Sequence, residues 1–136
     1  MIKAINKDVQ LLSQVSQPAS RADLPIAQDL KDTLAANGDR CVGMAANMIG
    51  VPKRVIIARL GPFPVVMFNP VIIAKSGPYQ TREGCLSLAG QRSTTRFQKI
   101  TVRFTNEQWT QQELSLDAFP AEIVQHEIDH CNGILI

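Results

Sequence analysis

Two stretches of the chain carry the apolar spacing of helices, and the first lies in the N-terminal third. Apolar residues recur every three or four positions from Leu24 to Leu34, which predicts a helix over residues 24–37 with one face on the core. Asp23 is placed to cap this helix, and Gly38 is placed to end it.

The second helix is predicted over residues 118–131, between a capping Asp117 and a terminating Gly133. Apolar side chains occupy two neighbouring stripes along it, so that much of its circumference is apolar. We therefore expect it to be the central, buried helix of the fold.

Between the two helices, short β-branched or alternating runs predict strands. These runs cover residues 55–58, 65–68, 71–74, 100–104 and 112–116. Turns are expected at 61–64, 69–70, 76–78 and 106–108, while residues 1–23 are expected to be irregular and residues 41–50 a loop. These elements predict a single α+β domain spanning residues 1–136, with antiparallel strands around the central helix and one outer helix.

The composition fits this architecture and narrows the range of functions. Apolar residues make up 45% of the chain and aromatic residues only 5%, so the core should be aliphatic. The net charge is only +2, with scattered Arg and Lys, which argues against nucleic-acid binding. The sequence has no apolar run of about 18 residues and no signal-peptide pattern, so we expect a cytoplasmic protein that does not enter membranes. Three cysteines, an odd number, are typical of a reduced cytosolic chain.

The candidate chemistry lies in the second helix, at residues 125–130, with the sequence QHEIDH. His126 and His130 are the only histidines, and their spacing places both on one face of a helix. Two imidazoles one turn apart can hold one divalent metal, with Glu127 beside them to act on a bound water. This pattern predicts a metallohydrolase with at least one further ligand elsewhere in the chain.

The residues themselves leave the third ligand open. A catalytic metal usually takes three protein ligands, and here the candidates are Cys41, Cys85, Cys131 and the carboxylates. Cys131 points about 100° away from His130 around the helix, so we expect it to pack in the core. Cys85 lies in a turn of small residues, where a metal would have room to approach.

Three motifs together resemble the peptide deformylase family. They are GMAANMIG at residues 43–50, EGCLS at 83–87 and QHEIDH at 125–130, in the order and at about the spacing found in that family. The resemblance extends over nearly the whole chain, and the second and third motifs together are highly specific.

The resemblance implies a metal site of Cys85, His126 and His130, with water in the fourth position and Glu127 as general base and then acid. The backbone N–H of Leu86 would stabilise the oxyanion. The implied metal is one divalent ion, natively Fe²⁺, with Zn²⁺, Ni²⁺ or Co²⁺ able to replace it. The implied partners are N-formylmethionyl peptides or nascent chains, met at the ribosome, from which the enzyme releases formate.

Three positions depart from the family pattern, and one of them is Cys41, which replaces the first glycine of the first motif. Met48 stands where the family has a glutamine that donates a hydrogen bond to the oxyanion, and a methionine cannot donate one. Asn47 is adjacent but, if the segment is extended, points to the opposite face. Glu122 stands where the family usually has an apolar residue. The substrate-binding residues implied by the resemblance are Val42, Gly43, Arg92, Phe119, Glu122 and Ile123.

Four hypotheses follow. The first is a metal-dependent deformylase, with activity reduced by Met48. The second is a deformylase-like paralogue that binds metal but serves as a binding or regulatory protein. The third is a general zinc endopeptidase, which the absence of a third metal-binding His or Glu motif disfavours. The fourth is a cysteine hydrolase using Cys85 and His126, which leaves Glu127 without a role.

Overall fold

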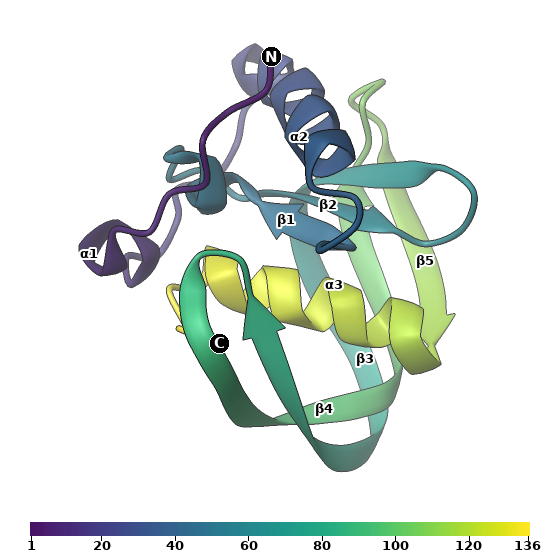
Figure 1. The fold of residues 1–136 in the computed structure, drawn as a ribbon. Helices are drawn as coiled ribbons and strands as arrows, with labels where there is room; N and C mark the ends of the chain where they lie inside the picture. Colours follow the sequence, from purple (N-terminus) through teal and green to yellow (C-terminus); the bar gives the residue numbers. More distant parts are fainter.

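The computed structural model describes residues 1–136 and places one long helix, α3 (Ala118–Cys131), at the centre of the fold (Figure 1). Apolar side chains such as Ala121, Val124 and Ile128 are buried on several sides of this helix. It packs against strands β1, β2, β4 and β5, which explains its broad apolar circumference. The predicted central helix is therefore confirmed. Asp117 occupies the N-cap position, but its side chain makes no capping hydrogen bond.

The strands form one antiparallel sheet in the order β1-β2-β3-β4-β5. They are β1 (Gly43–Ala45), β2 (Val55–Arg59), β3 (Pro64–Cys85), β4 (Leu88–Thr105) and β5 (Gln111–Asp117). In Figure 1 the sheet wraps around α3, with β1 and β2 on one side and the long β3 and β4 on another. The predicted α+β class is confirmed.

Strand β2 separates the two hydrophobic cores. Val55 and Ile57 point into a cluster shared with the outer helix, whereas Ile56 and Ala58 point into the cluster around α3. All four side chains are fully buried. A strand covered on both faces has no polar side to show, which explains why this stretch is apolar throughout.

The outer helix is α2 (Pro25–Ala36), which buries Leu30 and Leu34 against β1 and β2. Asp23 does not cap it, because its carboxylate accepts the backbone N–H of Ser20 at 2.8 Å and closes a preceding 3-10 turn instead. The short elements are α1 (Val9–Leu12), η1 (Arg21–Asp23) and η2 (Ala46–Ile49). Residues 1–23 and 41–50 thus contain more regular structure than the sequence predicted. None of the helices is long and apolar enough to cross a membrane.

The predicted turns at 69–70 and 76–78 are wrong, because β3 runs through both. Asn69 adopts a φ of 51° at a shift of register between β3 and β4, so the strand bends there without ending. Its side chain accepts from the Ala19 N–H at 2.7 Å and donates to the Ala19 carbonyl at 2.9 Å. Gly77 has a φ of 73°, which the strand also absorbs.

Strands β3 and β4 therefore form a long hairpin that ends next to Cys85. The register of β5 on β4 stops where Asp117 pairs with Lys99, so β4 before that point has a strand neighbour only on its β3 side. Helix α3 supplies backbone hydrogen-bond partners to the other edge at Phe97. The Gln125 side chain accepts from the Phe97 N–H at 2.8 Å and donates to the Phe97 carbonyl at 2.9 Å.

Candidate metal centre and substrate cavity

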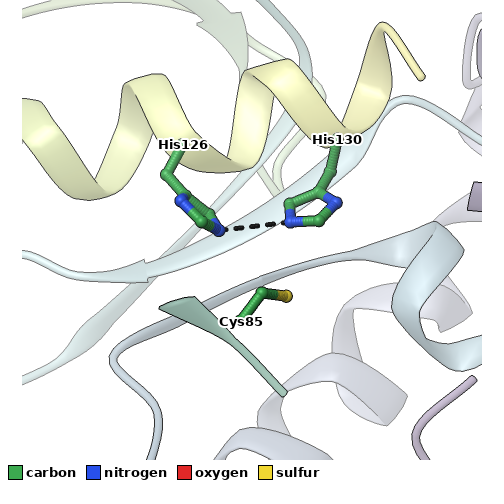
Figure 2. A group of neighbouring side chains, drawn as sticks. All are labelled: Cys85, His126 and His130. Atoms are coloured by element: carbon green, nitrogen blue, oxygen red, sulfur yellow. Dashed lines mark hydrogen bonds between the residues drawn. The ribbon is translucent and has the colours of Figure 1, made fainter. Parts of the chain in front are cut away.

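The three residues with metal-binding side chains come from two elements. Cys85 is the last residue of β3, at the tip of the long hairpin, and His126 and His130 lie one turn apart on α3. Figure 2 shows both imidazoles directed from the helix toward the space above the cysteine. The Nε2 atoms of the two rings are 3.2 Å apart, and the three candidate ligand atoms all lie within 4.8 Å of one another.

This arrangement fits a tetrahedral metal ion. Two nitrogen ligands at about 2.0–2.1 Å from such an ion lie about 3.3 Å apart, close to the 3.2 Å observed. The Nδ1 atom of His126 is 2.7 Å from Glu83 Oε1, so the ring proton belongs on Nδ1 and the Nε2 lone pair faces His130. Two imidazoles and a thiol that converge on one point form a donor set for a borderline or soft divalent cation.

Glu83 holds the first histidine through a buried ion-pair network. Arg96, only 3% exposed, donates to Glu83 Oε1 at 2.7 Å and to Asp129 Oδ2 at 2.6 Å. Burial opposes ionisation of Glu83, but the hydrogen bonds from His126 and Arg96 outweigh it and lower its pKa to about 2. The network joins β3, β4 and α3 directly behind the candidate metal ligands. Sequence reasoning missed it, although Glu83 opens the EGCLS motif.

Glu127 lies beside the ligands, in a position suited to a general base. Burial raises its pKa to about 7, within the range in which a carboxylate can take and return a proton at neutral pH. Its Oε1 atom is buried and has no hydrogen-bond partner within the protein. A Cβ atom on Gly43 would lie only 3.0 Å from Glu127 Oε2 and 2.9 Å from the Ile123 side chain, so this close approach requires glycine.

A cavity of about 500 Å³ opens next to these residues. Its lining contains nearly every residue that the sequence singled out: Val42, Gly43, Met48, Cys85, Leu86, Phe119, Glu122, Ile123, His126 and Glu127. Val42 and Phe119 are 40% and 56% exposed, so they form an apolar rim. His130 lies behind the lining and is fully buried.

Arg92 is the one predicted substrate residue that does not line the cavity. Its guanidinium donates to the Ala89 carbonyl at 3.3 Å. Arg96, four residues further along β4, does not reach the cavity either, because it is buried in the ion-pair network. Two other arginines, Arg40 and Arg82, line the cavity instead. No motif distinguishes them in the sequence, and only the fold brings them together.

Glu122 faces the cavity and is held in place. The Tyr79 hydroxyl donates to its carboxylate at 3.1 Å. Partial burial raises the pKa of Glu122, and the neighbouring Glu83 carboxylate raises it further. Glu122 therefore adds a polar group to a cavity whose rim residues, Val42 and Phe119, are apolar.

Met48 and Asn47 belong to a 3-10 turn, not to an extended segment. Met48 is only 1% exposed, and its Sδ atom lies 3.9 Å from Cys85 Sγ. Asn47 points elsewhere, because its amide donates to the His130 carbonyl at 2.8 Å. The expectation that Asn47 does not replace the missing glutamine agrees with this geometry, although the reason given for it was wrong.

Known proteins match this chain over nearly its whole length. The family model described as "Polypeptide deformylase" matches residues 2–136. A curated relative from Clostridium beijerinckii, named peptide deformylase, is 46% identical over 136 residues, which is all of both chains. A second, from Aquifex aeolicus and with the same name, is 40% identical over 117 residues, 80% of this chain and 68% of the relative.

Solved structures show the same similarity in three dimensions. The Met-Ala-Ser-bound crystal structure of a class I type b peptide deformylase from Acinetobacter baumannii is 31% identical, with a TM-score of 0.89. The match covers 99% of this chain and 97% of that one. An actinonin complex of the deformylase of a Vibrio parahaemolyticus bacteriophage is 28% identical, with a TM-score of 0.88, and the match covers 99% and 100% of the two chains.

Proposed function

The chain belongs to the peptide deformylase family of metal-binding hydrolases, and from this premise we propose that Cys85, His126 and His130 hold the metal and Glu127 moves the proton. The observation that carries this assignment is the convergence of the three ligand atoms, with the two Nε2 atoms 3.2 Å apart and Glu127 between the two histidines in sequence. The reaction of the family is the hydrolysis of the formyl amide at a peptide N-terminus.

The chain's own residues divide the work of this hydrolysis. When bound, the ion held by Cys85, His126 and His130 would supply Lewis-acid chemistry, which polarises the formyl oxygen and lowers the pKa of water. Glu127 accepts a proton from the attacking water, whose oxygen bonds to the formyl carbon. Glu127 then returns the proton to the amine nitrogen as the carbon–nitrogen bond breaks, which gives formate and a free N-terminus. The backbone N–H of Leu86 is the protein donor proposed for the oxyanion.

The metal proposed is Fe²⁺, with Zn²⁺, Ni²⁺ and Co²⁺ as substitutes. A thiol and two imidazoles suit all four of these ions, so the donor set supports the class of metal. Metal analysis of protein purified without oxygen tests the choice. About one Fe²⁺ per chain supports the proposal, whereas a full complement of Zn²⁺ in iron-replete cells would refute it.

The substrate proposed is the N-formylmethionyl end of a newly made protein. The cavity has an apolar rim formed by Val42 and Phe119 and an apolar wall at Ile123, which suit an unbranched thioether side chain. Formylated chains emerge at the ribosome, so we propose that the enzyme acts there, in the cytoplasm. Gly43 and Glu122 complete the proposed binding surface, while Arg92 would act only from outside the cavity.

The direct test is formate release from formyl-Met-Ala-Ser by metal-loaded protein kept free of oxygen. We expect turnover that is abolished in Glu127→Gln and in Cys85→Ser. The acetylated peptide serves as the control, because it presents the same side chains without a formyl group. Equal turnover by wild type and Glu127→Gln would contradict the proposed proton transfer.

Met48 is the observation that favours the second candidate function, a metal-binding protein with little catalysis. A methionine cannot donate to the oxyanion, and one missing donor costs about 10²–10³ in rate. We expect Met48→Gln to raise kcat by about that factor if the chain is an enzyme limited at this step. An inert protein that stays inert after this substitution would favour the binding role.

A further inference from the structure

We propose that Arg40 and Arg82 determine specificity beyond the first residue of the substrate, by favouring acidic side chains at the third and fourth residues of the formylated peptide. The inference rests on the proposed function, which identifies the cavity as the substrate site, and it adds a charge preference to that site. Neither arginine has a part in the proposed proton transfer or in holding the metal.

The two arginines line the same cavity from different segments of the chain. Arg40 ends the turn between α2 and β1, and Arg82 lies on β3 near the tip of the long hairpin. Arg40 is three residues from Gly43, which lies against Glu127, and Arg82 is three residues from the candidate ligand Cys85. Both cations therefore stand at a similar separation along the chain from the place of reaction.

This separation matches the reach of a bound peptide. Three residues of extended chain span about 10 Å, so a peptide with its formyl group at the centre carries its third residue about that far away. A nascent chain must continue from the cavity into solvent. Arg40 and Arg82 are both exposed, and the side chain of Arg40 is 65% exposed, so the two cations lie where such a chain leaves.

Both guanidinium groups have donors left for a ligand. Arg82 forms no ion pair and no side-chain hydrogen bond within the protein, although it lines the cavity. Arg40 donates to Asn37 Oδ1 at 3.0 Å, and its one ion-pair partner, Asp39, is 3.9 Å away and 82% exposed. Water screens such an exposed pair. A guanidinium presents five N–H donors in a planar fork, a geometry that matches a carboxylate.

The carboxylates of the cavity lining do not pair with these two cations. Glu83 forms its ion pair with Arg96 at 2.7 Å, and Glu122 accepts from the Tyr79 hydroxyl at 3.1 Å. Glu127 is only 4% exposed and lies beside the candidate ligands. An acidic peptide that leaves the cavity thus meets two available cations, whereas a basic peptide is repelled by them.

The first test compares three peptides, formyl-Met-Ala-Glu-Glu, formyl-Met-Ala-Ser-Ser and formyl-Met-Ala-Lys-Lys, on metal-loaded protein. All carry a C-terminal amide, so their side chains make the only difference in charge. We expect kcat/KM to be about 3–10-fold higher for the acidic than for the basic peptide at low salt, with the serine peptide between them. The ratio should fall below about twofold at about 0.5 M NaCl, because salt screens exposed charges.

A double variant, Arg40→Gln with Arg82→Gln, should lose this preference. The matched control is Arg21→Gln with Arg103→Gln, which removes the same net charge at exposed positions outside the cavity and should keep it. Circular dichroism establishes that both proteins are folded. Equal kcat/KM for the acidic and basic peptides in wild type, or a preference that survives in the Arg40/Arg82 variant, would overturn the proposal.

The second test measures binding without turnover. Isothermal titration calorimetry of the deformylated peptides Met-Ala-Glu-Glu and Met-Ala-Lys-Lys, again amidated, gives their Kd for wild type and both double variants. We expect the same order of preference and the same loss in the Arg40/Arg82 variant. A protein that prefers the acidic peptide but releases no formate would refute deformylation alone. An active enzyme that binds both peptides equally would refute only the role of the two arginines.

Discussion

Arg96 illustrates, at the scale of single residues, that this site depends on buried charges without a catalytic role. Its guanidinium forms ion pairs with both Glu83 and Asp129, and Glu83 in turn orients His126. The same charge on the surface would do far less, because water screens exposed ion pairs. The chain offers both cases, so the difference can be measured.

We expect Arg96→Met to lower the free energy of unfolding by about 3–5 kcal/mol, because it leaves two carboxylates without their partner. Arg103→Met is the matched control. Arg103 pairs with Glu113 at 2.9 Å, but both side chains are about half exposed, so the change should cost about 0–1 kcal/mol. Urea denaturation of both variants in the metal-loaded state measures the two free energies of unfolding. Equal losses would show that the buried ion pairs stabilise the protein no more than the exposed one.

Cys41 is expected to be a slow nucleophile although it lines the cavity. Burial raises the pKa of its thiol to about 11, and the Glu127 carboxylate adds to the shift. The thiolate fraction at pH 8 is then about a hundredfold below that of an ordinary thiol, so alkylation should be slower by that factor and accelerate up to about pH 11. Mass spectrometry of Cys41 after timed iodoacetamide treatment, with glutathione as reference, measures the rate. Reaction as fast as glutathione at pH 8 would contradict this expectation.

The sequence was sufficient to identify the residues that converge on the centre but not the contacts that hold them. His126 and His130 stand out because helical periodicity puts them on one face, and Cys85 stands out through its motif. Glu83 and Arg96 meet His126 and Asp129 across more than thirty residues of chain, and no local pattern encodes such pairs. For the same reason, the sequence did not predict that Arg40 and Arg82 line the cavity.

At the scale of elements, burial determined which predictions were correct. Helices α2 and α3 and strand β2 have strong apolar patterns because each packs on a core, and all three were predicted close to their observed bounds. The outer half of the β3–β4 hairpin is a mostly exposed two-stranded ribbon. Because this ribbon buries little, its sequence shows no clear alternation of apolar and polar residues. Gly77 and Pro78 were therefore predicted to form a turn, although the strand accommodates both.

Asn69 makes the bend in β3 testable. We expect Asn69→Ala to destabilise the protein by about 2–3 kcal/mol. The substitution removes two hydrogen bonds to Ala19. It also leaves an alanine at a φ of 51°, a left-handed conformation that asparagine tolerates better because its side chain can form local hydrogen bonds. Asn69→Gly loses the same bonds but tolerates the backbone, so it should cost about 1–2 kcal/mol. Thermal or urea unfolding gives the order, and a glycine variant less stable than the alanine variant would refute the role assigned to the backbone.

At the scale of the whole molecule, the metal should act as a structural link between the hairpin and the central helix. An ion that binds only the folded chain stabilises it by about 4 kcal/mol at a thousand times its dissociation constant. We therefore expect a chelator to lower Tm by several degrees. Calorimetry with and without chelator measures the shift, and Cys85→Ser should show a much smaller one. An unchanged Tm in wild type would mean that the fold does not depend on the ion.

The contact between the Gln125 amide and Phe97 affects how readily copies of this chain could aggregate. Beyond the end of β5, β4 presents an edge that another strand could join, and such edges invite aggregation. By taking both the N–H and the carbonyl of Phe97, the amide occupies one rung of that edge as a neighbouring strand would. Gln125 directly precedes His126, so the same turn of α3 both places that histidine and blocks pairing of another strand at Phe97.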